Sequence, residues 1–264
     1  MRYRLAVALV VAACARTPET AATPDLTNVD LVDLTHPFNA QTIYWPTETA
    51  RFQHEQRAYG PTPGGWFYSA FALSTPEHGG THLDAPIHFA EGKQTAESIP
   101  LDRLVARAVV IDVSAKAGAD RDYLATPDDI AAFEREHGQI AEGTIVLLRT
   151  GWSRHWGDRQ SYLGDSTPGD ASKLHFPSFG PDAARLLVEE RRVAALGVDV
   201  ASIDAGASTD FMVHRIAAAA NVPGFENLTN LDRLPATGAL VIALPMKIEG
   251  GSGGPLRAIA MVTR

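Results

Sequence analysis

Short apolar runs alternate with amphipathic segments along the chain from about residue 31 onward. Runs that are short and rich in β-branched residues predict strands, and they lie at 108–113, 144–149, 193–200, 240–244 and 256–262. Helix start and stop signals predict helices at 126–135, 180–191 and 211–220, the last one capped by Asp210. Interspersed strands and helices indicate an α/β or α+β class, and we predict an α/β fold with a mixed sheet.

The first residues follow a different pattern. Arg2 and Arg4 precede an apolar run at 5–13, which is too short to span a bilayer as a mature helix. A basic start, a short apolar stretch and small residues are typical of a secretory signal. We therefore predict a signal peptide at 1–13, a flexible tether rich in Pro, Thr and Ala at 14–28, and one domain at 29–264.

Cys14 directly follows this apolar run and is the only cysteine, so an intrachain disulfide is excluded. The stretch Val11-Ala12-Ala13-Cys14 resembles the lipobox of bacterial lipoproteins, in which the signal is cleaved before a cysteine that is then lipidated. The resemblance implies an exported protein, periplasmic or at the cell surface, that meets the membrane only through a lipid anchor on Cys14. An ordinary cleaved signal beside an incidental cysteine is the alternative.

The bulk composition narrows the classes of function. The chain has 264 residues, of which 45% are hydrophobic and 20% charged, as in ordinary globular proteins. Its formal net charge is −8, and it has no run of Lys or Arg. A nucleic-acid partner is therefore not expected.

The stretch EHGGTHLDAPIHF, at 77–89, holds three of the nine histidines. A helix is disfavoured there, because two glycines and one proline together cost about 5 kcal/mol. In an extended segment, alternate residues share one face. Four candidate metal or proton-transfer residues stand at even positions, namely His78, His82, Asp84 and His88. The two glycines permit a bend that brings the first histidine to the same site.

Two imidazoles and a carboxylate suit Zn, Mn or Fe(II), and three protein ligands leave a position open for water. His78, His82 and Asp84 are therefore candidate ligands of a catalytic ion, which activates water near neutral pH. His88, on the same predicted face, is a candidate proton shuttle. Ordinary hydrogen bonding of these histidines at the surface or in the core is the alternative.

The pattern H-x-G-T-H-x-D-x-P-x-H-F at 78–89 resembles the signature of the metal-dependent cyclase family. That family includes bacterial kynurenine formamidases, isatin hydrolases and enzymes labelled polyketide cyclases. Three later features match it as well: Trp45 in YWP, His214 in DFMVH and Glu226 in FENL. The similarity runs from about Leu31 to the C-terminus.

The resemblance implies a divalent metal cofactor, Zn or Mn, as one or two ions. His78, His82 and Asp84 are implied to bind the first ion. Asp84 and Glu226 are implied to bridge to a second ion, held also by His214.

The resemblance also implies a single layered β/β/α domain with a mixed sheet, like a swivelling domain, assembled as a homodimer. His88 is implied as the general acid/base and Trp45 as a contact of the substrate. The chain departs from small kynurenine formamidases after this tryptophan, where Thr47-Glu48 replaces their Gly-Asp, and the region 116–179 is longer than theirs. These departures weigh against specificity for formylkynurenine.

Together these features predict a metal-dependent amidohydrolase, similar to arylformamidases and isatin hydrolases, that cleaves a non-peptide C–N bond. The predicted substrate is a small aryl formamide or cyclic amide, attacked by metal-activated water while His88 moves the proton. Two alternatives stay open: a cyclase or lactonase that acts on an ester, and a lipid-anchored protein that binds a ligand without chemistry. Substrate turnover separates the three.

Two further stretches allow two interpretations each. The aromatic residues Trp66-Phe67-Tyr68 either join Phe89 and Trp45 in a wall for a planar substrate or pack in the core. The glycine-rich run 250–254 either lets backbone amides approach a ligand anion or simply connects two strands of a hairpin.

Overall fold

The computed structural model describes residues 26–264. The predicted signal peptide at 1–13, Cys14 and the predicted tether up to residue 25 lie outside the described residues. The last three residues of that tether, Leu26–Asn28, form a short 3-10 helix that leads directly into the first strand.

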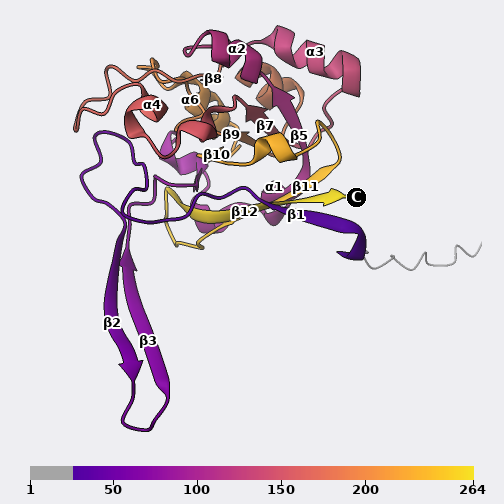
Figure 1. Ribbon diagram of the computed structural model, residues 1–264. Helices are drawn as coiled ribbons and strands as arrows, with labels where there is room; N and C mark the ends of the chain where they lie inside the picture. Colours follow the sequence, from indigo (N-terminus) through magenta and orange to yellow (C-terminus); the bar gives the residue numbers. More distant parts are fainter. Residues whose placement is uncertain (1–25) are drawn as a thin grey trace, which may run out of the picture.

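Eight strands form one mixed sheet that closes on itself (Figure 1). In spatial order they are β1 (Val29–Asp33), β12 (Gly253–Thr263), β11 (Ala239–Pro245), β5 (Val105–Asp112), β7 (Ile145–Arg149), β9 (Ala195–Val198), β10 (Gly224–Glu226) and β4 (His82–Asp84). β12 also pairs with β4, and this pairing closes the sheet into a barrel. Pairings among β5, β7, β9 and β10 are parallel and the others are antiparallel. The predicted α/β fold with a mixed sheet is confirmed.

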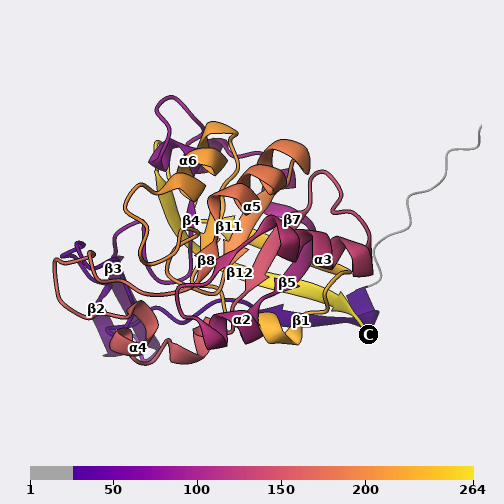
Figure 2. The ribbon, with the colours of Figure 1, turned by 90° about the horizontal axis from the view of Figure 1, so that it is seen from above.

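Most helices lie on one side of this barrel, away from β1 and β12 (Figures 1 and 2). The α-helices of residues 26–264 are α1 (Leu101–Leu104), α2 (Ser114–Ala119), α3 (Pro127–His137), α4 (Arg159–Leu163), α5 (Pro181–Arg185) and α6 (Met212–Ala219). A π-helical turn, Leu186–Glu190, continues α5, so the predicted helix at 180–191 is present with a wider last turn. None of the helices in residues 26–264 combines the length and apolar character that crossing a membrane requires.

Two apolar cores lie on opposite faces of the parallel strands. Val146 and Leu148 of β7 pack in one core with residues of α3, α5 and α6. Ile145 and Leu147, the alternate residues of the same strand, belong to the second core, inside the barrel. A strand that is buried on both faces is read in sequence as a continuous apolar run, and β7 is such a run.

The predicted strands are all present to within a few residues, but one predicted helix cap is wrong. Thr126 and Asp129 form a capping box at the start of α3, which corresponds to the helix predicted at 126–135. Asp210 does not cap α6. The residue before that helix, Phe211, is left-handed at φ 51°, and the carboxylate of Asp204 instead accepts hydrogen bonds from the Val213 and His214 amides.

Two small pairings lie outside the barrel. β6 (Leu124–Ala125) and β8 (Ser178–Phe179) form a short parallel pair. β2 (Gln53–Pro61) and β3 (Phe67–Ser74) form an antiparallel hairpin that extends far from the body, and we call residues 53–74 the arm (Figure 1). Both interpretations of the Trp66-Phe67-Tyr68 stretch are wrong, because these side chains are 63%, 60% and 53% exposed on the arm.

Candidate metal centre

Strand β4 carries two residues of the candidate site. It places His82 and Asp84 on one face, as predicted for an extended segment. Antiparallel pairing with β10 sets Glu226 directly opposite His82. Before the strand, the left-handed backbone of Gly79 (φ 141°) and Gly80 (φ 60°) turns the chain so that the preceding histidine reaches the same site.

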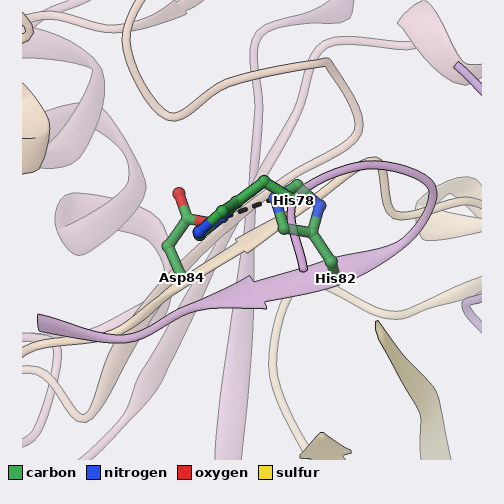
Figure 3. Close-up of side chains that lie close together, drawn as sticks. All are labelled: His78, His82 and Asp84. Atoms are coloured by element: carbon green, nitrogen blue, oxygen red, sulfur yellow. Dashed lines mark hydrogen bonds and ion pairs between the residues drawn. The ribbon is translucent and has the colours of Figure 1, made fainter. Parts of the chain in front are cut away.

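The predicted metal ligands converge on the Asp84 carboxylate. Its Oδ1 lies 2.7 Å from Nδ1 of His78 and 3.0 Å from Nε2 of His82 (Figure 3). Its Oδ2 lies 2.9 Å from Nε2 of His214, and that nitrogen lies 3.2 Å from Oε1 of Glu226. Two overlapping groups result, each with ligand atoms within 4.8 Å of one another and each including Asp84.

In His82 and His214, the ring nitrogen that faces away from Asp84 also has a hydrogen-bond partner. Nδ1 of His82 lies 3.0 Å from the carbonyl oxygen of Gly80, and Nδ1 of His214 lies 2.6 Å from Asp204. Since both partners are acceptors, both Nδ1 atoms carry a proton, and both Nε2 atoms are left to face the candidate metal position beside Asp84. Metal-binding histidines are commonly held in this way, and the arrangement therefore fits a divalent ion.

In His78 the two ring nitrogens have the opposite roles: Nδ1 faces Asp84 and Nε2 faces away from it. Its Nε2 lies 2.8 Å from the hydroxyl of Ser252, and that hydroxyl donates to Glu77 at 2.6 Å. The hydroxyl proton is committed to the carboxylate, so the serine oxygen accepts from Nε2–H and Nδ1 is left to face the candidate metal position beside Asp84. Ser252 belongs to the glycine-rich connection between the antiparallel strands β11 and β12, so the interpretation as a hairpin connection is confirmed, and this connection also contacts a candidate ligand residue.

His88 reaches the site by a different path from the one predicted. The chain leaves the extended conformation after Asp84, and Pro86–His88 form a 3-10 helix, so a shared strand face for His88 is wrong. Proline is favoured at the first position of such a turn. The imidazole nevertheless stacks on that of His78, with ring centroids 3.8 Å apart, and lines the same cavity.

The charges of the site favour cations. Burial works against protonation of His82, but Asp84 and Glu226 outweigh it and raise the pKa of His82 to about 9. Burial likewise works against a charged His214, yet its contacts with Asp204, Asp84 and Glu226 raise its pKa well above the ordinary value. Burial and the neighbouring Asp84 raise the pKa of Glu226. Excess negative charge that draws protons onto imidazoles also attracts a divalent cation.

His88 has the opposite tendency. Burial lowers its pKa to about 4, and the nearby Asp84 only partly offsets this effect. The ring is therefore neutral at physiological pH and has a lone pair available to accept a proton.

A cavity of about 320 Å³ opens above this cluster. Its walls include Trp45, Phe89 and Phe211, and Phe89 lies 4.4 Å from the His214 ring between centroids. The ring centroid of Trp45, the predicted substrate contact, lies 6.1 Å from the ring centroid of Phe211. Thr47 and Glu48 line the same cavity.

Sequence reasoning missed four residues of this site: Glu77, Asp204, Phe211 and Ser252. Glu77 and Phe211 stand next to motif residues, and that adjacency was the available signal. No motif links Asp204 to His214, ten residues later in α6, and Ser252 meets His78 across 174 residues, marked only by the glycine-rich run at 250–254.

Several known proteins are similar to this chain over most of its length. A family model described as "Putative cyclase" matches residues 32–205. An isatin hydrolase of Roseibium aggregatum is 39% identical over 208 residues, which cover 76% of this chain and 77% of that protein. A kynurenine formamidase of Salinibacter ruber is 29% identical over 236 residues, or 87% of this chain and 96% of that protein.

Solved structures agree with these relatives. An isatin hydrolase bound to the product analogue thioisatinate has a TM-score of 0.81 at 33% identity, over 90% of this chain and 94% of that one. A predicted metal-dependent hydrolase from Bacillus stearothermophilus has a TM-score of 0.66 at 26% identity, over 88% of this chain and 98% of that one.

Proposed function

The chain belongs to the cyclase family and is a metal-dependent hydrolase of C–N amide bonds, and on that premise we propose that its substrate is a small, uncharged aromatic amide, cyclic rather than formylated. The observation that carries this proposal is the aromatic cavity directly above the carboxylate and histidine cluster. A planar ring held between such walls brings its carbonyl to the polar floor.

Two groups of residues are proposed as the metal ligands. His78, His82 and Asp84 would hold one ion, and Asp84 with His214 and Glu226 would hold a second. Nitrogen and carboxylate donors suit Zn and Mn equally, so the donor set supports both. When bound, a divalent ion lowers the pKa of water toward neutrality and polarises a carbonyl oxygen.

His88 is proposed as the proton carrier. Its ring lines the cavity, it is neutral at physiological pH, and it stacks on His78 without occupying the Asp84 carboxylate. A neutral imidazole can accept a proton from the attacking water and return it to the leaving nitrogen as the C–N bond breaks.

The wall of the cavity departs from the small kynurenine formamidases beside the tryptophan. Thr47, where those enzymes commonly carry glycine, lines the cavity together with Trp45 and Glu48. This departure, and the higher identity to an isatin hydrolase than to a kynurenine formamidase, support a cyclic amide as the substrate. Trp45 is proposed to pack on the aromatic ring of the substrate.

Proton release by the purified protein tests this function. The protein is loaded with Mn or Zn and given isatin, N-formylkynurenine and an aromatic lactone at equal concentrations. Metal-dependent hydrolysis of isatin, faster than that of the other two, is expected. Preference for the lactone would identify an esterase, and stoichiometric metal binding without any turnover would favour a binding protein.

We further propose export and anchoring through a lipid on Cys14, as the lipobox-like stretch indicates. We expect the wild-type protein in the membrane fraction and the Cys14→Ser variant in the soluble fraction. Equal distribution of the two proteins would contradict the anchor.

A further inference from the structure

Ser202 lies in the segment that follows β9, at the wall of the cavity above the candidate metal ligands. The residue is only 3% exposed, so its hydroxyl is almost completely removed from bulk water. It lines the cavity together with His214 and Glu226, two of the candidate ligands. Neither the proposed ligand groups nor the proposed proton carrier include this hydroxyl.

The backbone at Ser202 is held in place by side chains from two other segments. The hydroxyl of Ser178 donates to the carbonyl oxygens of Ser202 and Ile203, at 2.8 and 2.7 Å. The amide of Ile203 donates to Oε1 of Glu226 at 2.8 Å. Direct contact with a candidate ligand therefore fixes the position of Ser202 relative to the candidate metal centre, as a precise contact with a reacting group requires.

The proton of the Ser202 hydroxyl has no acceptor within residues 26–264. In this part of the chain, Oγ accepts a hydrogen bond from the Asp204 amide at 3.2 Å and makes no other hydrogen bond. A hydroxyl has one proton to donate in addition to the lone pairs that accept. Because a buried donor without an acceptor is costly, the cavity is where this proton finds its partner. A carbonyl oxygen of a bound substrate can be that acceptor.

Three other hydroxyl or amide side chains line the same cavity, and each differs from Ser202. The hydroxyl of Tyr44 donates to that of Thr75 at 2.7 Å, because the Thr75 hydroxyl itself donates to a carbonyl oxygen. The side-chain amide of Asn227 is bonded at both its oxygen and its nitrogen. Thr47 is exposed. Ser202 is therefore the buried hydroxyl of this cavity that is free to donate to a ligand.

We propose that Ser202 is a catalytic residue that donates a hydrogen bond to the carbonyl oxygen of the amide under attack. The inference rests on the proposed function, because it needs an amide bound above the candidate ligands. When water adds to the carbonyl carbon, a C–O bond forms and the π electrons of the C=O bond move to this oxygen, which becomes negatively charged. As the carbonyl re-forms, the C–N bond breaks and the leaving nitrogen takes the proton that His88 holds. Ser202 keeps its own proton throughout.

A hydroxyl that faces this oxygen stabilises the charged adduct more than it stabilises the substrate. A hydrogen bond to a charged oxygen is roughly twice as strong as one to a neutral carbonyl, and this difference lowers the barrier. The Asp204 amide adds to the effect, because a hydroxyl that accepts a hydrogen bond becomes a better donor. Asp204 therefore acts on both sides of the cavity: its carboxylate orients His214 and its amide polarises Ser202.

Steady-state kinetics of Ser202→Ala on isatin test this role. Loss of one such donor should lower kcat about 100-fold, while KM changes less than about threefold, because the interaction strengthens only as charge develops. Metal content should equal that of wild type, since Ser202 is not a candidate ligand.

Ser178→Ala is the matched control. It removes a buried hydroxyl that supports the same segment but does not line the cavity, so its kcat should stay within about threefold of wild type. Equal losses in the two variants would show that support of the segment is what matters, and would overturn the proposal. A higher KM for Ser202→Ala with an unchanged kcat would also overturn it.

Infrared spectroscopy of bound isatin gives a readout that does not depend on turnover. His88→Gln should hydrolyse isatin slowly, so isatin that is isotope-labelled at its amide carbonyl can be observed while bound, with and without Ser202→Ala. Loss of the donor should move the carbonyl stretch to higher frequency, because a hydrogen bond weakens the C=O bond. An unchanged frequency would overturn the proposal even if kcat falls.

Failure of this inference differs from failure of the proposed function. If the wild-type protein neither binds nor hydrolyses isatin, the proposed function is wrong and the role of Ser202 falls with it. If the wild type hydrolyses isatin and Ser202→Ala does so equally fast, the role of Ser202 alone is wrong.

Discussion

Asp204 holds Nδ1 of His214 at 2.6 Å and also accepts hydrogen bonds from the amides of Val213 and His214. One carboxylate thus caps the first turn of α6 and orients the imidazole that the turn carries. Nε2 of His214 is thereby aimed at Asp84 and Glu226. His214 itself outweighs burial and lowers the pKa of Asp204, so this partner stays ionised.

Replacing Asp204 with Asn should weaken metal binding about 10- to 100-fold, as loss of such a supporting partner commonly does. The amide oxygen can replace only part of the carboxylate's hydrogen bonding, and the negative charge that supports the imidazole is lost. Calorimetric titration with Zn or Mn measures the change. Asp210→Asn is the control, since Asp210 lies nearby but contacts Ser208 and no candidate ligand within residues 26–264. Equal affinities of the two variants would contradict this role.

Ser252 offers a second test of orientation, now at His78. Ser252→Ala removes the acceptor for Nε2–H, so the ring can turn and Nδ1 loses its fixed direction toward Asp84. Metal affinity should fall about tenfold or more. Ser252→Thr keeps the hydroxyl and should restore most of the affinity. If the alanine variant bound metal as tightly as wild type, the serine would be a packing residue only.

His88→Gln tests the proton carrier. The variant should keep its full metal content, because His88 makes no contact with the Asp84 carboxylate among the described hydrogen bonds, yet kcat should fall about 100-fold or more. Metal analysis and turnover of isatin on the same sample provide the two readouts. His137→Gln, at the end of α3, is the matched histidine control. Unchanged turnover of the His88 variant would remove it from the mechanism.

The local part of the site was predictable from the sequence. His82 and Asp84 stand two residues apart, and the period of two in a strand places them on one face whatever the rest of the chain does. Glu226 and His214 were reached through the family resemblance, since pairing of β4 with β10 is a long-range event that no local pattern records. The path of His88 was missed for a local reason, because Pro86 starts a 3-10 turn there.

The arm was beyond sequence reasoning for a different reason. Aromatic and aliphatic residues that alternate with small ones in β3 are the pattern of any half-buried strand. Whether such a face packs in the core of its own chain depends on where the hairpin leaves the barrel. The alternation therefore does not reveal that Phe71 lies 42% exposed on the arm.

The buried position of His36 leads us to expect that the protein loses stability at low pH. Burial lowers its pKa to about 4, its ring stacks on Trp156 at 4.1 Å between centroids, and its Nε2 has no hydrogen-bond partner among the described residues. In the unfolded chain the pKa returns to the ordinary value near 6.5, so the unfolded state binds more protons between pH 6.5 and 4. The free energy of unfolding should therefore fall as the pH drops through this window.

Between pH 7 and pH 4.5 this single group should cost about 2.5 kcal/mol of stability. His36→Phe keeps a flat ring on Trp156 but cannot bind a proton. Urea unfolding of the metal-free wild type and variant at the two pH values isolates the contribution of His36, because every other titrating group is shared. The variant should lose about 2.5 kcal/mol less than wild type on acidification. Equal losses in the two proteins would mean that His36 is protonated without penalty in the folded state, and that the buried stack on Trp156 opens to admit water.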